Sequence, residues 1–406
     1  MKRRNRKAIG VALAGGGPLG AIYEIGALVA LQDALRGVDL VNCDVYVGVS
    51  SGGVIATGLA NGLTPRDMYR MFIADEAAEH AFDPDILLRP AFAEYARRLA
   101  AIPDLCLQAA RRYLENPLSY GFFESFQRLA RAVPTGLFDN NAFSAFLTRL
   151  LSGPGRTNDF RELRHKLFLV ATDLDSGKAV PFGAPGWDHV PIARAVQATT
   201  ALPGLFPPVE IDGRYYVDGA LMKTLHASVA LKEGASLLFC VNPLVPFNAS
   251  LAHDEGFSGG FSLMDHGLPA VMSQTFRSII HSRMKTGMDR YRTEFPDADV
   301  LLFEPGQGDV EMFFTNVFSY ASRKRLAEHA YQRTLADLRR RREQLEPVLA
   351  RHGVELDMYV IGARRQSIAS GPSSALHGRD LREATLELDQ TLDALNAVLK
   401  TRLPAK

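Results

Sequence analysis

The chain has 406 residues, of which 47% are apolar and 22% are charged, a balance typical of a globular protein with a sizeable core. Its formal net charge of +1 excludes a protein built as a whole to bind nucleic acid or another strongly acidic partner. The three cysteines, Cys43, Cys106 and Cys240, are far apart and fit neither a zinc site nor a disulfide framework. They favour a reducing, cytoplasmic location.

The N-terminus imitates a secretory signal, with a basic start, MKRRNRK, followed by an apolar run, AIGVALAGGG. The apolar part is short and ends in glycines, so we expect it to stay on the chain and to form a strand. No apolar run reaches the roughly 18 residues of a membrane-spanning helix, so any membrane contact is expected to be peripheral.

The first hundred residues predict an α/β domain. Residues 8–14 predict a buried strand, and apolar residues at helical spacing from Ile22 to Leu35 predict the helix after GGGPLG. Residues 45–49 predict a second strand, and a helix of small residues follows Gly52. The order strand, turn, helix, strand predicts a parallel sheet with helices packed on it.

The middle of the chain changes character twice. Residues 64–136 have a helical, arginine-rich pattern, which predicts a helical insertion lying as a layer over the domain. Residues 166–183 and 207–220 each predict a hairpin, and Asp212-Gly213 in the second suits a two-residue type I′ turn. The remaining predicted elements are strands over 236–244 and 299–306 and a charged helix near 321–350.

A nucleophile is predicted at the end of the second strand. Gly48-Val49-Ser50-Ser51-Gly52 matches G-x-S-x-G between a predicted strand and a predicted helix. At such a turn the glycines leave room for a strained backbone, and the central serine is presented as a nucleophile. The N-terminus of the following helix stabilises developing negative charge. The pattern therefore predicts that Ser50 attacks and that Ser51 merely begins the helix.

Gly15, Gly16 and Gly17 form a second loop between a strand and a helix, where backbone N–H groups can point at one oxygen atom. Beside a serine nucleophile this loop predicts an oxyanion hole. The same letters also read as the dinucleotide fingerprint G-x-G-x-x-G, with Asp39 about 20 residues further on. That fingerprint needs its acidic residue at the end of the second strand, whereas Asp39 precedes it. A nucleotide-binding or scaffold protein with an idle serine is therefore the weaker alternative.

The serine needs a base. The ten histidines have no distinctive setting, although histidine is the usual partner. Asp218 ends the strand YYV in the turn DGA, at the edge of the predicted sheet where Ser50 also lies. An Asp-Gly pair is common in turns, so this position at a strand end is what favours Asp218 as the base.

Taken in order and at these separations, GGGPLG, GVSSG, ATTALPGLFPP and DGA resemble the motifs of the patatin-like phospholipases, and the hairpin ATDLDSGK is similar too. The resemblance implies an α/β protein with a three-layer α/β/α patatin-like domain. It implies a Ser-Asp dyad of Ser50 and Asp218 without histidine, with the glycine loop as oxyanion hole. It also implies lipid acyl esters as substrates and no metal or organic cofactor.

Two positions depart from that family. Leu19 fills a position of the glycine loop that is usually basic, and Ala14 one that is commonly acidic. Hydrolysis by the dyad does not need these charges, but recognition of an anionic head group can depend on them. An acyl-ester hydrolase is therefore better supported than a phospholipase. Acyl transfer to an alcohol acceptor is an alternative that the sequence does not separate from hydrolysis.

The resemblance also divides the chain. We expect a catalytic domain over 8–245, with the insertion at 64–136, and a mixed α/β extension over 246–363. A linker over 364–376 then leads to an amphipathic helical tail over 377–406. The stripe of that tail consists of Leu381, Leu388, Leu392, Leu395 and Leu399.

The tail and two basic clusters bear on partners. An apolar stripe needs a partner, which for the tail is its own domain, a second copy in a homo-oligomer, or a bilayer. The basic clusters, residues 2–7 and Arg339 to Arg342, suit anionic lipid head groups, although solvated surface is the simpler interpretation.

Overall fold

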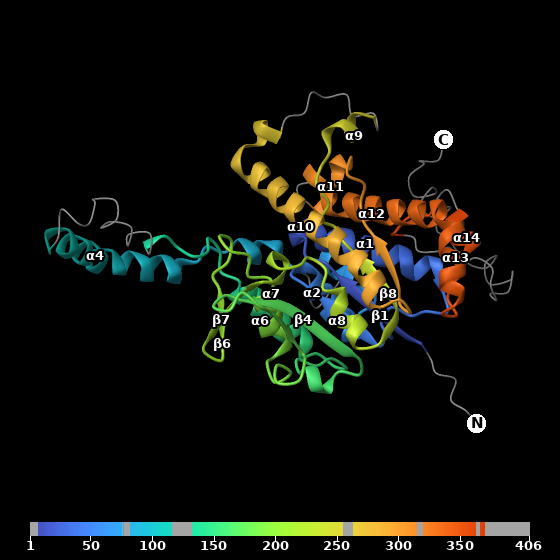
Figure 1. Cartoon of the computed structure of the whole chain (residues 1–406), viewed down its shortest axis with the longest axis horizontal. Coiled ribbons are helices and arrows are strands. Elements are labelled where there is room, and N and C mark those ends of the chain that lie inside the picture. The colour runs from blue at the N-terminus through green and yellow to red at the C-terminus, as the bar shows by residue number, and fades with distance from the viewer. Residues whose placement is uncertain are drawn as a thin grey trace, which may run out of the picture.

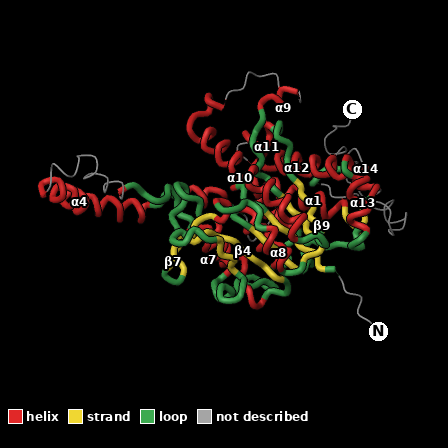
Figure 2. The backbone as a smooth tube through the Cα atoms, in the orientation of Figure 1, coloured by secondary structure: helices red, strands yellow, loops and turns green. Residues whose placement is uncertain are grey.

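The computed structural model describes residues 7–74, 76, 82–115, 132–254, 263–314, 320–362 and 366–369. A mixed sheet lies at the centre of this part of the chain (Figures 1 and 2). Its strands are β1 (Ala8–Leu13), β3 (Val45–Gly48), β4 (Lys166–Asp173), β5 (Ala179–Phe182), β6 (Val209–Ile211), β7 (Arg214–Asp218), β8 (Ala235–Val241) and β9 (Asp299–Phe303). The strand order is β6-β7-β4-β3-β1-β8-β9, with β5 also paired to β4.

The centre of the sheet is parallel and one edge is antiparallel. β1 pairs in parallel with β3 and with β8, so the loops that follow β1 and β3 meet at one edge of the sheet. The two predicted hairpins are confirmed as the antiparallel pairs β4–β5 and β6–β7. Asp212 and Gly213 have φ angles of 50° and 74°, and two positive φ angles are what a type I′ turn requires.

Helices cover both faces of the sheet, which confirms the predicted three-layer α/β/α fold. Successive residues of β1 point to opposite faces, so Val11 and Leu13 join one core cluster and Ala12 joins the other. The helices are α1 (Gly17–Ala34), α2 (Ser51–Ala60), α3 (Pro65–Tyr69), α4 (Phe92–Glu115), α6 (Asn141–Leu151), α7 (Ile192–Thr199), α8 (Ala227–Lys232), α9 (Ala249–Asp254), α10 (Gly267–Glu294), α11 (Val310–Phe314), α12 (Tyr320–Arg340), α13 (Arg342–Ala350) and α14 (Met358–Gly362). The first cluster takes residues from α1, α2, α6, α7 and α12, and the second from α8 and the end of α10.

The segment 64–136 is helical in most of its described part. Met68, Met71 and Ile73 near its start are buried in the main core cluster, whereas α4 does not lie on the domain. α4 extends away from the sheet, as Figure 1 shows at the left of the molecule. Phe92, Leu99 and Leu107 of this helix are all more than half exposed. Residues 75, 77–81 and 116–131 of the predicted insertion lie outside the described residues.

The fold does not stop at residue 245. β9 pairs in parallel with β8 and so extends the central sheet. α12 packs on α1 so closely that a Cβ on Gly26 would lie 2.5 Å from the carbonyl oxygen of Ala327. A second, small antiparallel pair joins β2 (Leu35–Arg36) to β10 (Glu355–Leu356). Residues 246–362 therefore share their sheet and their helical layer with the N-terminal part.

The predicted linker begins with residues that are attached to this layer. Ile368 is 2% exposed, its N–H donates to Glu328, and its carbonyl oxygen accepts from Arg66 at 2.8 Å. The remainder of the linker and the leucine stripe of the tail lie outside the described residues, as does most of the basic cluster 2–7.

Candidate active site

Ser50 lies on a strained turn between β3 and α2. β3 ends at Gly48, and α2 begins at Ser51, as predicted. Ser50 has a φ of 52° and a ψ of −125°, a combination that non-glycine residues rarely adopt. A Cβ on Gly52 would lie 2.5 Å from the carbonyl oxygen of Ala14, so only glycine lets α2 approach the end of β1 this closely. Because Ala14 directly precedes the glycine loop, this close approach brings Ser50 next to that loop.

The glycine loop lies against this serine. A Cβ on Gly15 would come within 3.0 Å of the Cβ of Ser50, and the N–H of Gly15 donates to the carbonyl oxygen of Thr224 at 3.4 Å. Gly17 is exposed, with a φ of 60°, and begins α1. Within the described residues, the N–H groups of Gly16 and Gly17 donate to no acceptor. Two N–H groups of the loop are therefore left without an acceptor among the described residues.

Asp218 lies next to Ser50. It ends β7 and is 2% exposed. Its carboxylate accepts the N–H of Ala220 at 2.8 Å and lies beside the side chain of Ser50. Burial raises the pKa of Asp218 from 3.8 to about 6, and the Ser50 side chain and the N–H of Ala220 partly oppose that rise. The structure thus brings together the two predicted residues in an arrangement in which a carboxylate can take a proton from the serine hydroxyl.

One residue that holds this pair in place was not predicted. The hydroxyl of Thr199, at the end of α7, accepts the backbone N–H of Ser50 at 3.0 Å and donates to the carbonyl oxygen of Val170 in β4. Two residues later, the carbonyl oxygen of Ala201 accepts the backbone N–H of Asp218 at 3.0 Å. The segment ATTALPG carries part of the family resemblance, and its physical role here is to fix both backbones.

His226 is the histidine nearest in sequence to Asp218. It is buried, and the backbone of Gly219 and of Lys223 lies close to its ring. Burial lowers the pKa of His226 to about 4, so its ring is neutral at physiological pH. Its Nε2 has no hydrogen-bond partner among the described residues. His226 therefore packs beneath the turn after Asp218 instead of linking it to Ser50.

The nucleotide alternative finds no support in the position of Asp39. Asp39 lies before β3, where its carboxylate accepts from Asn42 and from the N–H of Val41. The nearby Asp44 accepts from Ile9 at the start of β1, whereas the glycine loop follows the end of β1. Asp39 and the glycine loop therefore lie at opposite edges of the sheet.

Two features that the sequence left open can now be described. Leu19 is half-buried and packs against the main core cluster. The cluster Arg339 to Arg342 is bonded within the protein: Arg339 donates to the carbonyl oxygen of Ile361, Arg340 and Arg341 pair with Asp337, and Arg342 pairs with Glu346. These arginines are therefore not a free cationic patch.

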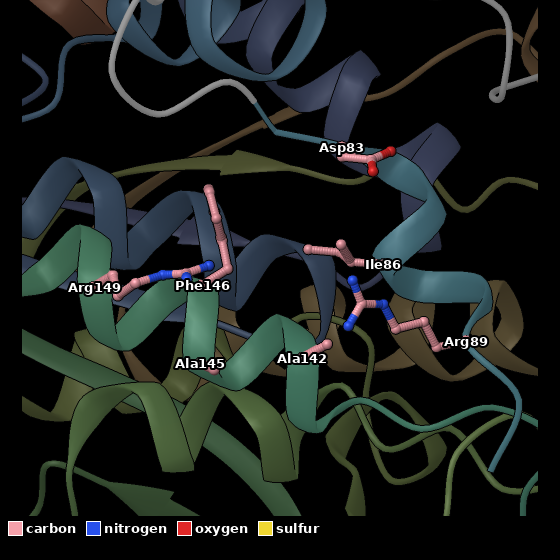
Figure 3. Close-up of a pocket in the computed structure, with 7 residues that line it drawn as sticks. All are labelled: Asp83, Ile86, Arg89, Ala142, Ala145, Phe146 and Arg149. Atoms are coloured by element: carbon pink, nitrogen blue, oxygen red, sulfur yellow. The ribbon is translucent and has the colours of Figure 1, made fainter. Parts of the chain in front are cut away.

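A cavity of about 300 Å³ opens elsewhere, between α6 and the 3-10 helix Pro84–Leu88 (Figure 3). Its lining residues are Asp83, Ile86, Arg89, Ala142, Ala145, Phe146 and Arg149. None of them belongs to the glycine loop, the serine turn or the Asp218 turn, so this cavity is separate from the candidate site.

In the part of the chain that the structure describes, no cluster of His, Cys, Asp and Glu side chains is placed to hold a metal ion. No described helix is both long enough and apolar enough to span a bilayer.

The fold and the site define an α/β protein with a serine elbow, a glycine loop and a buried aspartate at one edge of the sheet. The model of the family described as patatin-like phospholipase matches residues 11–231, more than half of the chain. The chain therefore belongs to the patatin-like phospholipase family.

Its similarity to individual proteins is partial. Uncharacterized NTE family proteins of Mycobacterium tuberculosis and Mycobacterium bovis are 36% identical over 73 residues, which is 18% of this chain and 19% of each relative. Among solved structures, VipD from Legionella pneumophila has a TM-score of 0.39 and 15% identity, covering 82% of this chain and 66% of its own. ExoU of Pseudomonas aeruginosa has a TM-score of 0.35 and 17% identity, covering 83% and 53% respectively.

Proposed function

We propose that the chain is a lipid acyl hydrolase that cleaves carboxylic esters with Ser50 as nucleophile and Asp218 as base. The observation that carries this proposal is the buried carboxyl of Asp218 beside the Ser50 side chain, with its pKa raised to about 6. A carboxylate with a pKa near 6 is a better proton acceptor than an ordinary aspartate and is still ionised at neutral pH.

The reaction has two halves. In the first, Ser50 attacks the ester carbonyl carbon, Asp218 accepts the hydroxyl proton, and the N–H groups of Gly16 and Gly17 donate to the oxyanion. The carbon–oxygen bond of the ester then breaks, and the leaving alcohol takes the proton from Asp218. In the second, water attacks the acyl-enzyme and gives a proton to Asp218. The bond between the acyl carbon and Ser50 then breaks, the serine oxygen takes the proton back from Asp218, and the carboxylic acid is released. No metal or organic cofactor is needed for these steps.

Family membership supports a lipid as substrate, and the glycine loop narrows the expectation. The loop has Leu19 where a basic residue is usual in the family, and this side chain packs against the core. The loop therefore presents no cationic side chain at that position. We therefore propose acyl esters of lipids as the substrate class, without assigning an anionic head group to this loop.

Acyl transfer is the second candidate, because the acyl-enzyme reacts with whichever hydroxyl reaches it. Adding an alcohol acceptor such as glycerol separates the two reactions by the ratio of free acid to new ester among the products.

The direct test is hydrolysis of a panel of neutral and phospholipid esters by the purified protein, by Ser50→Ala and by Asp218→Asn. The proposal predicts release of free fatty acid by the wild type and a loss of at least about 10³-fold in both variants. Turnover by Ser50→Ala equal to that of the wild type would overturn it.

A further inference from the structure

One face of α10 is apolar and exposed in the part of the chain that the structure describes. The opposite face is anchored: the side chain of Gln274 bonds to both the N–H and the carbonyl oxygen of Phe247, and Arg277, Met284 and Tyr291 are buried. On the outer face, every third or fourth residue is apolar and between 41% and 72% exposed. These residues are Leu268, Met272, Phe276 and Ile279. In Figure 1, α10 begins near the top of the molecule and runs down toward its centre.

This stripe leads toward the candidate active site. One turn beyond Ile279, Arg283 reaches the carbonyl oxygens of Leu221 and Met222 at 3.4 and 3.5 Å. These residues follow directly on the Asp218 turn, and the side chain of Met222 is 36% exposed. The apolar stripe therefore ends at the loop that carries the proposed base.

Two cations stand at that end of the stripe. Lys223 and Arg283 line the same small surface depression and are both exposed. Among the described residues, neither has a carboxylate within ion-pairing distance. They differ in this from Arg340, Arg341 and Arg342, which are all paired with acidic side chains.

We propose that this surface, the α10 face (Leu268, Met272, Phe276 and Ile279 with Met222, Lys223 and Arg283), docks on an anionic lipid surface. The inference rests on the proposed function, because a hydrolase of lipid esters must bring its site to a lipid aggregate. Apolar side chains on one helix face enter the boundary between head groups and acyl chains, and cations beside them meet the phosphates. Docking by this face brings the Asp218 turn to the lipid.

The test measures vesicle binding apart from catalysis, in the Ser50→Ala background, by flotation with phosphatidylcholine vesicles with and without phosphatidylglycerol. Phe276→Glu/Ile279→Glu removes the apolar part and should weaken binding to both vesicles by about tenfold or more. Lys223→Gln/Arg283→Gln should weaken binding to the anionic vesicles only. Leu99→Glu/Leu107→Glu on α4, where the two leucines are 65% and 52% exposed, is the matched control and should bind as the parent does.

The same substitutions in the active protein separate docking from chemistry. Phe276→Glu/Ile279→Glu should hydrolyse a soluble short-chain ester within about twofold of the wild-type rate and lose most of its activity on vesicles. If no ester is hydrolysed but binding follows the α10 face, the proposed function fails and the docking surface stands.

Three results would overturn the docking proposal. The first is unchanged vesicle binding by both α10 variants, and the second is loss of binding in the α4 control alone. The third is a change from dimer to monomer in light scattering when Phe276 and Ile279 are replaced, with vesicle binding unchanged. The last result would assign the α10 face to a second copy of the chain.

Discussion

The hydroxyl of Thr199 accepts the backbone N–H of Ser50 at 3.0 Å, across a separation of 149 residues in sequence. The same hydroxyl donates to the carbonyl oxygen of Val170, so it couples the strained serine turn to β4. Both Ser50 and Thr199 are buried, and no other described acceptor takes this N–H. Thr199 therefore positions the proposed nucleophile without itself touching a substrate.

Thr199→Val should lower both stability and turnover. Valine has the same shape but leaves the N–H of Ser50 and the carbonyl oxygen of Val170 unsatisfied, at a cost of about 2 to 4 kcal/mol. Urea unfolding and hydrolysis of a soluble ester measure the two effects. Thr199→Ser should recover most of both.

Thr200→Val is the matched control for this prediction. The hydroxyl of Thr200 donates only to carbonyl oxygens of α7, those of Val196 and Gln197. Its loss should cost under about 1 kcal/mol and leave kcat unchanged. Equal effects at Thr199 and Thr200 would show that the bond to Ser50 has no particular role.

Asp218 should set the acidic limb of the pH profile. It acts as a base only when ionised, and its pKa is raised to about 6, so kcat/KM should rise with pH and level off above about pH 7. A profile on a soluble ester measures this. A limb near pH 4 instead would mean that the titration of Asp218 does not limit the reaction.

Asp218 should also affect stability in a pH-dependent way. Its folded pKa lies above its usual value of 3.8, so the folded state binds the extra proton and stability falls as pH rises from about 4 to 6. Asp218→Asn removes this ionisation and should be more stable than the wild type at pH 8 by up to about 3 kcal/mol. At pH 4 the two proteins should be nearly equal. A constant difference between them at the two pH values would contradict the raised pKa.

The strain at Ser50 should appear as a difference between two inactive variants. Ser50→Gly and Ser50→Ala both lose the hydroxyl, but only glycine adopts a φ of 52° without steric cost. Ser50→Gly should therefore be more stable than Ser50→Ala by about 1 kcal/mol in urea unfolding. The reverse order would mean that the turn relaxes when the hydroxyl is removed.

Parts of this fold and site were accessible from the sequence because their causes are local. A side chain at Gly52 would clash with the carbonyl oxygen of Ala14, so this position requires glycine. That steric requirement is the reason why the G-x-S-x-G pattern can be recognised in the sequence. Positive φ angles at Asp212 and Gly213 likewise fix the hairpin turn. Every residue of β1 from Ile9 to Leu13 is apolar or glycine, so the sequence alone predicts a strand that is buried on both faces.

Other parts depend on contacts between distant segments. Thr199 looks like any helical threonine until the serine turn is placed beside it. The arginines near residue 340 formed a basic patch in the sequence, whereas Asp337 and Glu346 neutralise three of them. The helical pattern of α4 predicted its conformation but not its direction, because direction is set by what a helix packs against.

The end of the chain gives a further prediction. A chain ending at residue 369 should keep its hydrolysis of soluble esters, because the described fold and the proposed site are complete by then. A chain ending at 365 loses the buried Ile368 and its bonds to Arg66 and Glu328, which should cost about 2 kcal/mol. Thermal unfolding compares the two. Insolubility of the 369 form would place the leucine stripe of the tail in the core.

The central claim is that Ser50 is an activated nucleophile, and labelling by a fluorophosphonate probe tests it most directly, because only an activated serine reacts. The wild type, Ser50→Ala and Ser51→Ala are labelled under the same conditions, and the modified peptide is identified by mass spectrometry. The account predicts a label on Ser50 in the wild type and in Ser51→Ala, and none in folded Ser50→Ala. A label that persists in Ser50→Ala, or that is found on Ser51, would contradict it.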